Sequence, residues 1–217
     1  MPLAVAPSLI AGDQARLGDE LRAIEAAGAD MAHLDVMDGH FVPNLTIGPG
    51  IVADLRRLST LTFDCHLMLS EPGRYVDSFV KAGADRITVH AEIPGVAGTL
   101  DAIRRHGRVA GLAITPETPV AAVVDNMRLA DFVLVMTVHP GFYGQRLIRE
   151  ALDKVGEVRQ ALRALGRDVP IQVDGGVSAE NVGLIAEAGA DEVVAGAAVF
   201  KAADYRLAIG ALRLGCG

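Results

Sequence analysis

The chain of 217 residues has the length of one compact domain or of a small α/β barrel. Apolar residues make up 51% of it and aromatic residues only 4%, with no tryptophan, so the core must rest on aliphatic side chains, as in buried parallel strands. The formal net charge of −7 argues against nucleic acid or an anionic membrane surface as a partner, and no apolar run is long enough to cross a bilayer.

Segments rich in β-formers alternate with helical segments along the chain. The apolar start, residues 1–10, is short and lacks a basic segment, so we interpret it as a first strand and not as a signal peptide. The expected strands are 3–8, 31–36, 61–68, 86–90, 108–114, 132–136, 169–174 and 192–196. Helices are expected between them, such as 14–27, 74–81 and 147–165; the last has apolar residues at a helical period, at Leu147, Ile148, Ala151, Leu152, Val155 and Val158. The two cysteines, Cys65 and Cys216, make no disulfide framework.

An Ala-Gly-Ala-Asp repeat stands before every second strand. It occupies 27–30, 82–85 and 188–191, with a degenerate Leu-Ala-Asp copy at 129–131. Its glycine is typical of a helix end, where the chain takes a left-handed conformation. The intervals average about 54 residues, and one βα unit needs roughly 30 or fewer. The repeat therefore predicts eight βα units, a TIM (β/α)8 barrel that forms a single domain over residues 1–217. An open doubly wound sheet is the alternative.

Polar side chains gather where these strands end, which is where barrels of this kind form their sites. Strand side chains alternate between two faces, so three polar sets share a face: His33, Asp35 and Met37; Asp64, His66 and Met68; and Gln172 and Asp174. The apolar residues between them should face the helices, so the polar sets point inward. An inward ionisable group is costly unless it is paired or coordinated. His33, Asp35, His66 and Asp174 could therefore share one divalent cation, such as Zn, Fe, Mn or Co. Taken singly, each could instead be a hydrogen-bonded core histidine or a capping aspartate.

Glycine-rich loops follow three consecutive strands, at 139–145, 174–178 and 196–198. Glycine lets backbone N–H groups approach an anion, and the following helix adds a favourable dipole. Loops after the last two strands of such barrels often hold phosphate. No lysine or arginine precedes Arg146 in these loops, so a phosphate would be held by the backbone. Ordinary turn glycines are the alternative explanation.

These motifs resemble those of the ribulose-phosphate 3-epimerase family. The longest matching run is 33–48, His-Leu-Asp-Val-Met-Asp-Gly-His-Phe-Val-Pro-Asn-Leu-Thr-Ile-Gly. Shorter runs follow in the family's order over nearly the whole chain: 6–9, 64–68, 88–92, 136–142, 173–177 and 196–200. The resemblance implies a cytoplasmic isomerase of the pentose phosphate pathway or of carbon fixation, which interconverts D-ribulose 5-phosphate and D-xylulose 5-phosphate. It also implies a homo-oligomer, either a dimer or a hexamer.

The same resemblance assigns roles residue by residue. It implies that His33, Asp35, His66 and Asp174 bind one divalent metal ion, and that Asp35 and Asp174 are also the acid/base pair. Ser8 and His66 would contact substrate oxygens, and Met37, Met68 and Met136 would form an apolar cushion against the reacting carbons. Gly144, Gly175, Gly176, Gly196 and Ala197 would present N–H groups to the phosphate, and Gly141 would be a further substrate contact.

Epimerisation at carbon 3 removes a proton next to the carbonyl and returns one to the opposite face. That reaction needs two bases on opposite sides of the substrate. Asp35 and Asp174 belong to the second and seventh strands, three strands apart around a ring of eight, so we expect them to face each other across the barrel mouth. Metal-assisted transfer through an enediolate is the expected chemistry.

The chain departs from the family pattern at the phosphate end. Tyr143 takes a usual glycine position, Leu147 a common phenylalanine position, His139 a usual acidic or amide position, and Ala197 a usual serine position. These changes leave open a 3-epimerase of a six-carbon ketose phosphate, such as allulose 6-phosphate. A phosphate-binding lyase or decarboxylase would carry an Asp-x-Lys-x-x-Asp run, and the chain has His66 in the comparable stretch instead. A non-catalytic relative should have lost a ligand or a base, whereas all four are kept.

Overall fold

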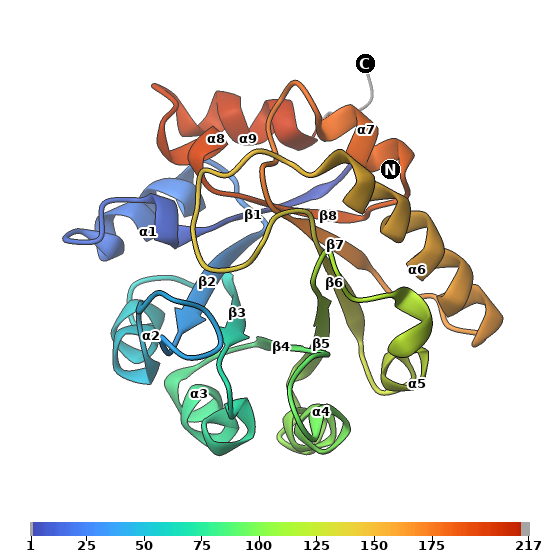
Figure 1. The fold of residues 1–217 in the computed structure, drawn as a ribbon. Helices are drawn as coiled ribbons and strands as arrows, with labels where there is room; N and C mark the ends of the chain where they lie inside the picture. The colour runs from blue at the N-terminus through green and yellow to red at the C-terminus, as the bar shows by residue number, and fades with distance from the viewer. Residues whose placement is uncertain (1, 214–217) are drawn as a thin grey trace.

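Eight parallel strands form a closed ring in the computed structural model, which describes residues 2–213. The sheet order is β1-β8-β7-β6-β5-β4-β3-β2, and a bridge between Ser8 and His33 joins β1 to β2. Helices surround the ring (Figure 1). The predicted TIM barrel is confirmed, and the open sheet was the wrong alternative. Met1 and residues 214–217, which hold Cys216 and both ends of the predicted domain 1–217, lie outside the described residues.

The strands follow the predicted ones within one or two residues. They are β1 Ala4–Pro7, β2 Met31–Met37, β3 Thr62–Met68, β4 Arg86–His90, β5 Val109–Ile114, β6 Phe132–Met136, β7 Ile171–Asp174 and β8 Glu192–Ala195. The α-helices are α1 Leu17–Ala26, α2 Pro49–Arg56, α3 Val76–Ala82, α4 Val96–Arg105, α5 Val124–Met127, α6 Asp153–Ala164, α7 Val182–Glu187, α8 Ala197–Phe200 and α9 Tyr205–Arg213. Short 3-10 turns lie at η1 Leu9–Ala11, η2 Pro72–Arg74, η3 Val120–Ala122 and η4 Arg149–Leu152. No helix among these described elements is both long and apolar enough to span a bilayer.

Three predicted helices begin later than their apolar pattern indicated. The predicted helix 147–165 was wrong at its start, because the backbone N–H of Ile148 donates to the carbonyl of Thr137 at 2.8 Å and holds this segment as a loop. A 3-10 turn then leads into α6. Gln14 lies outside α1, because its side-chain amide donates to the carbonyl of Leu9 at 2.8 Å. Arg74 likewise belongs to the turn η2 and not to α3.

The aspartate of each repeat anchors the neighbouring strand. The carboxylates of Asp30, Asp85, Asp131 and Asp191 accept the backbone N–H groups of Val5, Phe63, Ala110 and Ile171, which lie in β1, β3, β5 and β7. Each aspartate also pairs with an arginine. Arg56, Arg104 and Arg159 belong to the helix that precedes the anchored strand, and Arg213 belongs to the last helix, α9, which contacts β1. The repeat glycines Gly28, Gly83 and Gly189 have φ of 88°, 100° and 104°, as a left-handed helix end requires. In each complete copy of the repeat, the glycine thus ends a helix and the aspartate fixes the end of a neighbouring strand.

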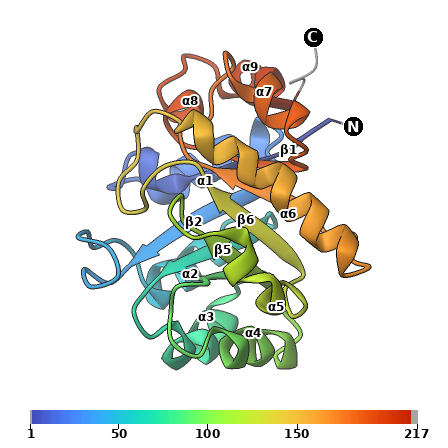
Figure 2. The same cartoon turned by 45° about the vertical axis from the view of Figure 1, so that its right-hand side comes forward.

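The barrel has an apolar outer layer, and its interior holds a polar network beside smaller apolar clusters. Leu34, Val36, Cys65, Leu67 and Val173 pack into the core between the strands and the helices, as predicted. Inside the ring, both terminal nitrogens of Arg86 on β4 bind Glu192 on β8, at 3.0 and 2.7 Å. The Gln172 side chain donates to both Glu192 and Asp64, at 3.1 and 2.9 Å. In Figure 2 the arrowhead of β2 points to the side where the loops after β2 and β6 lie, which is the mouth of the barrel.

Candidate metal centre and substrate cavity

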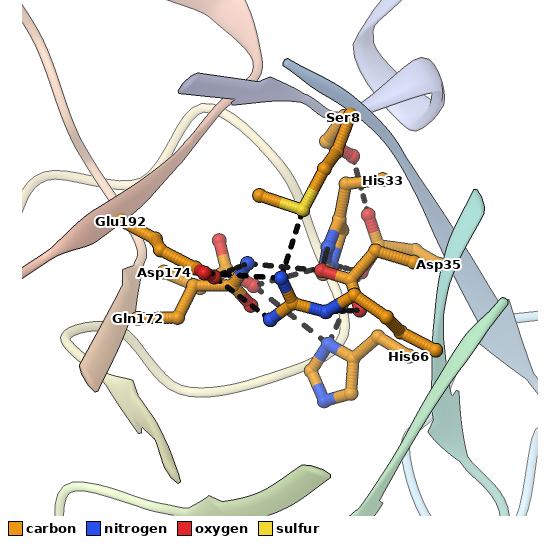
Figure 3. A network of polar contacts seen from close by, with 10 residues as sticks. Ser8, His33, Asp35, His66, Gln172, Asp174 and Glu192 are labelled. Atoms are coloured by element: carbon orange, nitrogen blue, oxygen red, sulfur yellow. Dashed lines mark hydrogen bonds and ion pairs between the residues drawn. The ribbon is translucent and has the colours of Figure 1, made fainter. Parts of the chain in front are cut away.

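The four predicted ligands meet at the mouth of the barrel, at the ends of β2, β3 and β7. One ligand atom from each of His33, Asp35, His66 and Asp174 lies within 4.8 Å of all the others. Nε2 of His33 is 3.5 Å from Oδ1 of Asp35 and 3.9 Å from Oδ2 of Asp174. Nδ1 of His66 is 3.5 and 3.7 Å from the same two oxygens. The side chains converge on one point (Figure 3), so the two aspartates face each other across the ring.

The donor set fits a divalent cation. His33 Nε2 and His66 Nδ1 are buried and have no hydrogen-bond partner among the described residues. A buried polar nitrogen left unpaired costs about 1–3 kcal/mol, so two of them pointing at the same carboxylates need an explanation. Two imidazole nitrogens and two carboxylate oxygens are ligands that Zn²⁺ and related divalent ions accept. The four residues therefore form a candidate metal site.

The two aspartates have opposite protonation preferences in the metal-free protein. Burial, together with the charges of Asp35 and Asp64, raises the pKa of Asp174 to about 7, against the lowering effect of His33. Burial also acts to raise the pKa of Asp35, but His33 and His66 outweigh it and hold this pKa well below its ordinary value. Asp35 also accepts a hydrogen bond from the Ser8 hydroxyl. Asp35 is thus ionised at neutral pH, whereas Asp174 is near the midpoint of its titration.

A cavity of about 350 Å³ opens above these carboxylates. It is lined by Asp35 and Asp174 and by the predicted substrate contacts Ser8, Met37, Met68, Met136, Gly141, Gly144, Gly175, Gly176, Gly196 and Ala197. His66 is fully buried beneath its wall. No lysine or arginine of residues 2–213 lines it. The residues that strand alternation and loop position predicted for the site therefore lie close together in the structure. Substrate binding by these residues stays a prediction.

Comparison with known proteins identifies the family. The sequence model of the "Ribulose-phosphate 3 epimerase family" matches residues 4–200. The ribulose-phosphate 3-epimerase of Bacillus subtilis (strain 168) is 47% identical over 96% of this chain and 97% of its own. Those of Synechocystis (strain PCC 6803) and Escherichia coli (strain K12) are 47% and 46% identical, over 97% and 96% of this chain and 93% and 94% of theirs. The chain belongs to this family.

Solved structures of lower identity share the fold of this family member. A 3-hexulose-6-phosphate synthase superimposes with a TM-score of 0.71 at 23% identity, over 100% of both chains. A 3-keto-L-gulonate-6-phosphate decarboxylase from Vibrio cholerae superimposes with a TM-score of 0.74 at 15% identity, over 99% of this chain and 97% of its own. At such identities the likeness establishes the barrel alone.

The glycine turn after β7 is packed against the loop that follows β6. Gly176 has φ of 66°, and a Cβ there would lie 2.3 Å from the backbone nitrogen of Leu147. Gly175 has φ of 127°, and its Cβ would lie 2.8 Å from the backbone nitrogen of Val138. Glycine is therefore required at both positions. Tyr143, one of the departures from the pattern of the epimerase family, lies in the loop after β6, lines the cavity and is 55% exposed.

Sequence reasoning gave no role to three polar residues behind the ligands. Asp64 was placed on the inward face, and its Oδ2 lies 3.0 Å from Nδ1 of His33, on the ring edge opposite the cation position. His90 lies behind His66, and Glu92 lies behind His90. The alternation of Arg86, Thr88 and His90 with Ile87 and Val89 was the available signal. The contacts themselves depend on the register between strands, which one sequence does not contain.

Proposed function

We propose that this chain is a ribulose-phosphate 3-epimerase that interconverts D-ribulose 5-phosphate and D-xylulose 5-phosphate. The observation that carries this proposal is the pair of opposed carboxylates, Asp35 and Asp174, in one cavity whose far end is built from glycine turns. Curated relatives named for this activity, at 45–47% identity over nearly the whole chain, support the assignment. The enzyme is an isomerase.

In the metal-free protein the pKa values of the two aspartates differ in the direction that a two-base reaction needs at its start. Ionised Asp35 removes the proton from carbon 3 on one face, and protonated Asp174 donates a proton to the other face. The reverse reaction exchanges their roles, so the pair titrates as a coupled set. A divalent cation held by His33, Asp35, His66 and Asp174 would supply positive charge next to the enediolate oxygens and lower the demand on the base.

Other residues of the cavity bind the substrate and exclude water from it. Met37, Met68 and Met136, all buried, would cover the reacting carbons with side chains that offer no competing base. The backbone N–H groups of Gly144, Gly175, Gly176, Gly196 and Ala197 would hold the phosphate, and Ser8 and Gly141 would contact the sugar. We expect the cation to be Zn, Fe, Mn or Co, the protein to be a dimer or hexamer, and its compartment to be the cytoplasm.

The test is a coupled assay with ribulose 5-phosphate and, in parallel, allulose 6-phosphate, together with elemental analysis of the purified protein. We expect a higher kcat/KM on ribulose 5-phosphate, and loss of activity on chelation that a divalent metal reverses. Asp35→Asn and Asp174→Asn should each lower kcat by about 10³-fold or more, because each removes one of the two proton-transfer groups. Circular dichroism should show that both variants remain folded.

Three outcomes would contradict parts of this assignment. Near-normal activity of either asparagine variant would refute the two-base chemistry. Faster turnover of allulose 6-phosphate would favour the six-carbon alternative, which the altered residues Tyr143 and Ala197 motivate. Full activity of rigorously metal-free protein would refute the role of the cation.

A further inference from the structure

Residues 88–92, one of the segments that match the family, have no role in the chemistry described so far. They nevertheless contact the candidate metal site on the side away from the cavity. His90 ends β4 and is fully buried, with its side chain inside the ring. Its Nε2 lies 2.9 Å from Nε2 of His66, and its Nδ1 lies 3.2 Å from Oε2 of Glu92. A continuous line of hydrogen bonds thus runs from the ligand His66 through His90 to a carboxylate.

The direction of these hydrogen bonds is fixed from the Glu92 end. Oε1 of Glu92 accepts the backbone N–H of Thr115 at 2.9 Å and the hydroxyls of Thr115, at 3.1 Å, and of Thr118. Burial acts to raise the pKa of Glu92, but hydrogen bonds from His90, Thr118 and Thr115 outweigh it and lower this pKa to about 2. With three donors on Oε1, Glu92 is an ionised carboxylate that can only accept. His90 must therefore donate from Nδ1, which leaves its Nε2 as an acceptor. The proton between the two histidines then belongs to Nε2 of His66.

This assignment leaves Nδ1 of His66 without a proton, and Nδ1 is the atom that faces Asp35 and Asp174. The ring planes support the same arrangement. The rings of His90 and His66 lie edge to edge, with 5.0 Å between centroids and 20° between planes, and Phe41 packs on His90 at 4.7 Å. His33 is fixed differently, since its Nδ1 contacts the carboxylate of Asp64 and its Nε2 faces the cation position.

We propose that His90 and Glu92 form a positioning pair that holds His66 in its Nε2–H tautomer and so presents Nδ1 to a divalent cation. The proposal rests on the metal centre of the proposed function, because it explains how one of its ligands is prepared. His90 acts through His66 and touches neither the cation position nor the reacting atoms. Partners of this kind orient a histidine ligand and typically change metal affinity by about 10- to 100-fold when removed.

The test compares variants that keep or remove the hydrogen-bond line. His90→Leu removes it, whereas the amide of His90→Gln can accept from His66 and donate to Glu92. Glu92→Gln can donate toward His90 and so permits the reversed direction. Thr88→Val is the matched control, because Thr88 is a buried, inward residue of the same strand whose hydroxyl has no hydrogen-bond partner among the described residues.

Two readouts separate positioning from packing. Competition with a chelator measures Co²⁺ affinity, and the visible spectrum of bound Co²⁺ reports the ligand geometry. Nitrogen NMR of the metal-free protein reports which nitrogen of His66 carries the proton. We expect His90→Leu to weaken Co²⁺ binding by about 10- to 100-fold and Glu92→Gln by about 10-fold. Both should shift the His66 proton toward Nδ1. His90→Gln should recover most of the affinity, and Thr88→Val should match the wild type.

The possible failures are distinguishable. Wild-type protein that binds no Co²⁺ would refute the metal centre itself. Wild-type binding with no loss in Glu92→Gln and no difference between His90→Leu and Thr88→Val would refute the positioning pair alone. If the His90→Leu variant does not fold, the Glu92→Gln variant and the tautomer measurement decide the question. An unchanged His66 tautomer in Glu92→Gln would overturn the proposal.

Discussion

Asp174 and Asp35 differ in the neighbouring groups that set their pKa values. Both aspartates face His33 and His66, but Asp35 also accepts a hydrogen bond from Ser8, whereas the charges of Asp35 and Asp64 act on Asp174. In the metal-free protein a proton on Asp174 therefore neutralises a carboxylate whose charge the cation would otherwise balance. Strand alternation was enough to predict that both carboxyl groups enter the barrel, since a period of two is visible in one strand. Their opposite pKa shifts depend on neighbours from three other strands, which alternation does not reveal.

The raised pKa of Asp174 predicts how the stability of the metal-free protein depends on pH. Between its ordinary pKa of 3.8 and its folded value of about 7, the folded state binds a proton that the unfolded state has released. Stability from this group is therefore complete below about pH 4 and is lost as pH rises through 7. Relative to Asp174→Asn, the wild type should lose about 2 to 3 kcal/mol between pH 5 and pH 8.

Urea unfolding in the presence of a chelator, at each pH, measures this difference. Parallel curves for the wild type and Asp174→Asn would show that Asp174 does not hold a proton in the folded state. Adding Zn²⁺ should reverse the trend for the wild type alone, because a metal binds the ionised carboxylate and its stabilisation grows as pH rises.

At the scale of elements, the repeated aspartate ties each helix–strand pair to the next strand. Asp85, for example, accepts the N–H of Phe63 at 2.9 Å and an N–H of Arg56 at 3.0 Å. The spacing of the repeat predicted eight units, and its glycine predicted the helix ends. The anchoring role of the aspartate was not predicted, because its partner lies about 20 residues upstream, across a strand boundary. The late start of α6 was missed because the 3-10 residues Ala151 and Leu152 bury apolar side chains with the same spacing as a helix.

Replacing such an anchor should cost stability without affecting the site. We expect Asp85→Ala to lower the free energy of unfolding by about 1–3 kcal/mol, because the N–H of Phe63 and the charge of Arg56 lose their acceptor. KM for ribulose 5-phosphate should stay unchanged, since Asp85 is at the opposite end of the barrel from the cavity. Asp77→Ala is the control: its exposed pair with Lys81 should contribute at most about 1 kcal/mol. Equal unfolding midpoints for the two variants would contradict the anchor.

At the scale of the whole molecule, a polar network crosses the barrel interior and reaches the site. Arg86 on β4 joins Glu192 on β8, Gln172 on β7 joins Glu192 to Asp64 on β3, and Asp64 contacts the ligand His33 on β2. Figure 3 labels Glu192, Gln172 and His33 of this network. The floor of the site is thus part of what holds opposite walls of the ring together. Closure of the ring was predictable from the count of units. The network was not, since its members come from five separate strands.

Breaking this network on one side should be costly. We expect Arg86→Met to destabilise the protein by about 3–5 kcal/mol, because Glu192 and Asp64 keep buried charges without their partner. The double variant Arg86→Met with Glu192→Gln should recover part of that loss, since one of the unpaired charges is removed. Thermal and urea unfolding of the three proteins measure the difference. A double variant no more stable than Arg86→Met would show that the charge of Glu192 is not the source of the cost.

The absence of lysine and arginine from the cavity lining within residues 2–213 has a kinetic consequence. A phosphorylated sugar approaches a molecule of net charge −7, and no basic side chain of residues 2–213 lines the cavity proposed to receive it. If the proposed function holds, we expect selectivity for the phosphate dianion to come from short-range dipoles of the main chain rather than from basic side chains of the cavity. Added salt screens the repulsion between the acidic protein and an anionic ligand, so we expect salt to raise the association rate constant. In an enzyme whose entrance is lined by basic side chains, salt has the opposite effect.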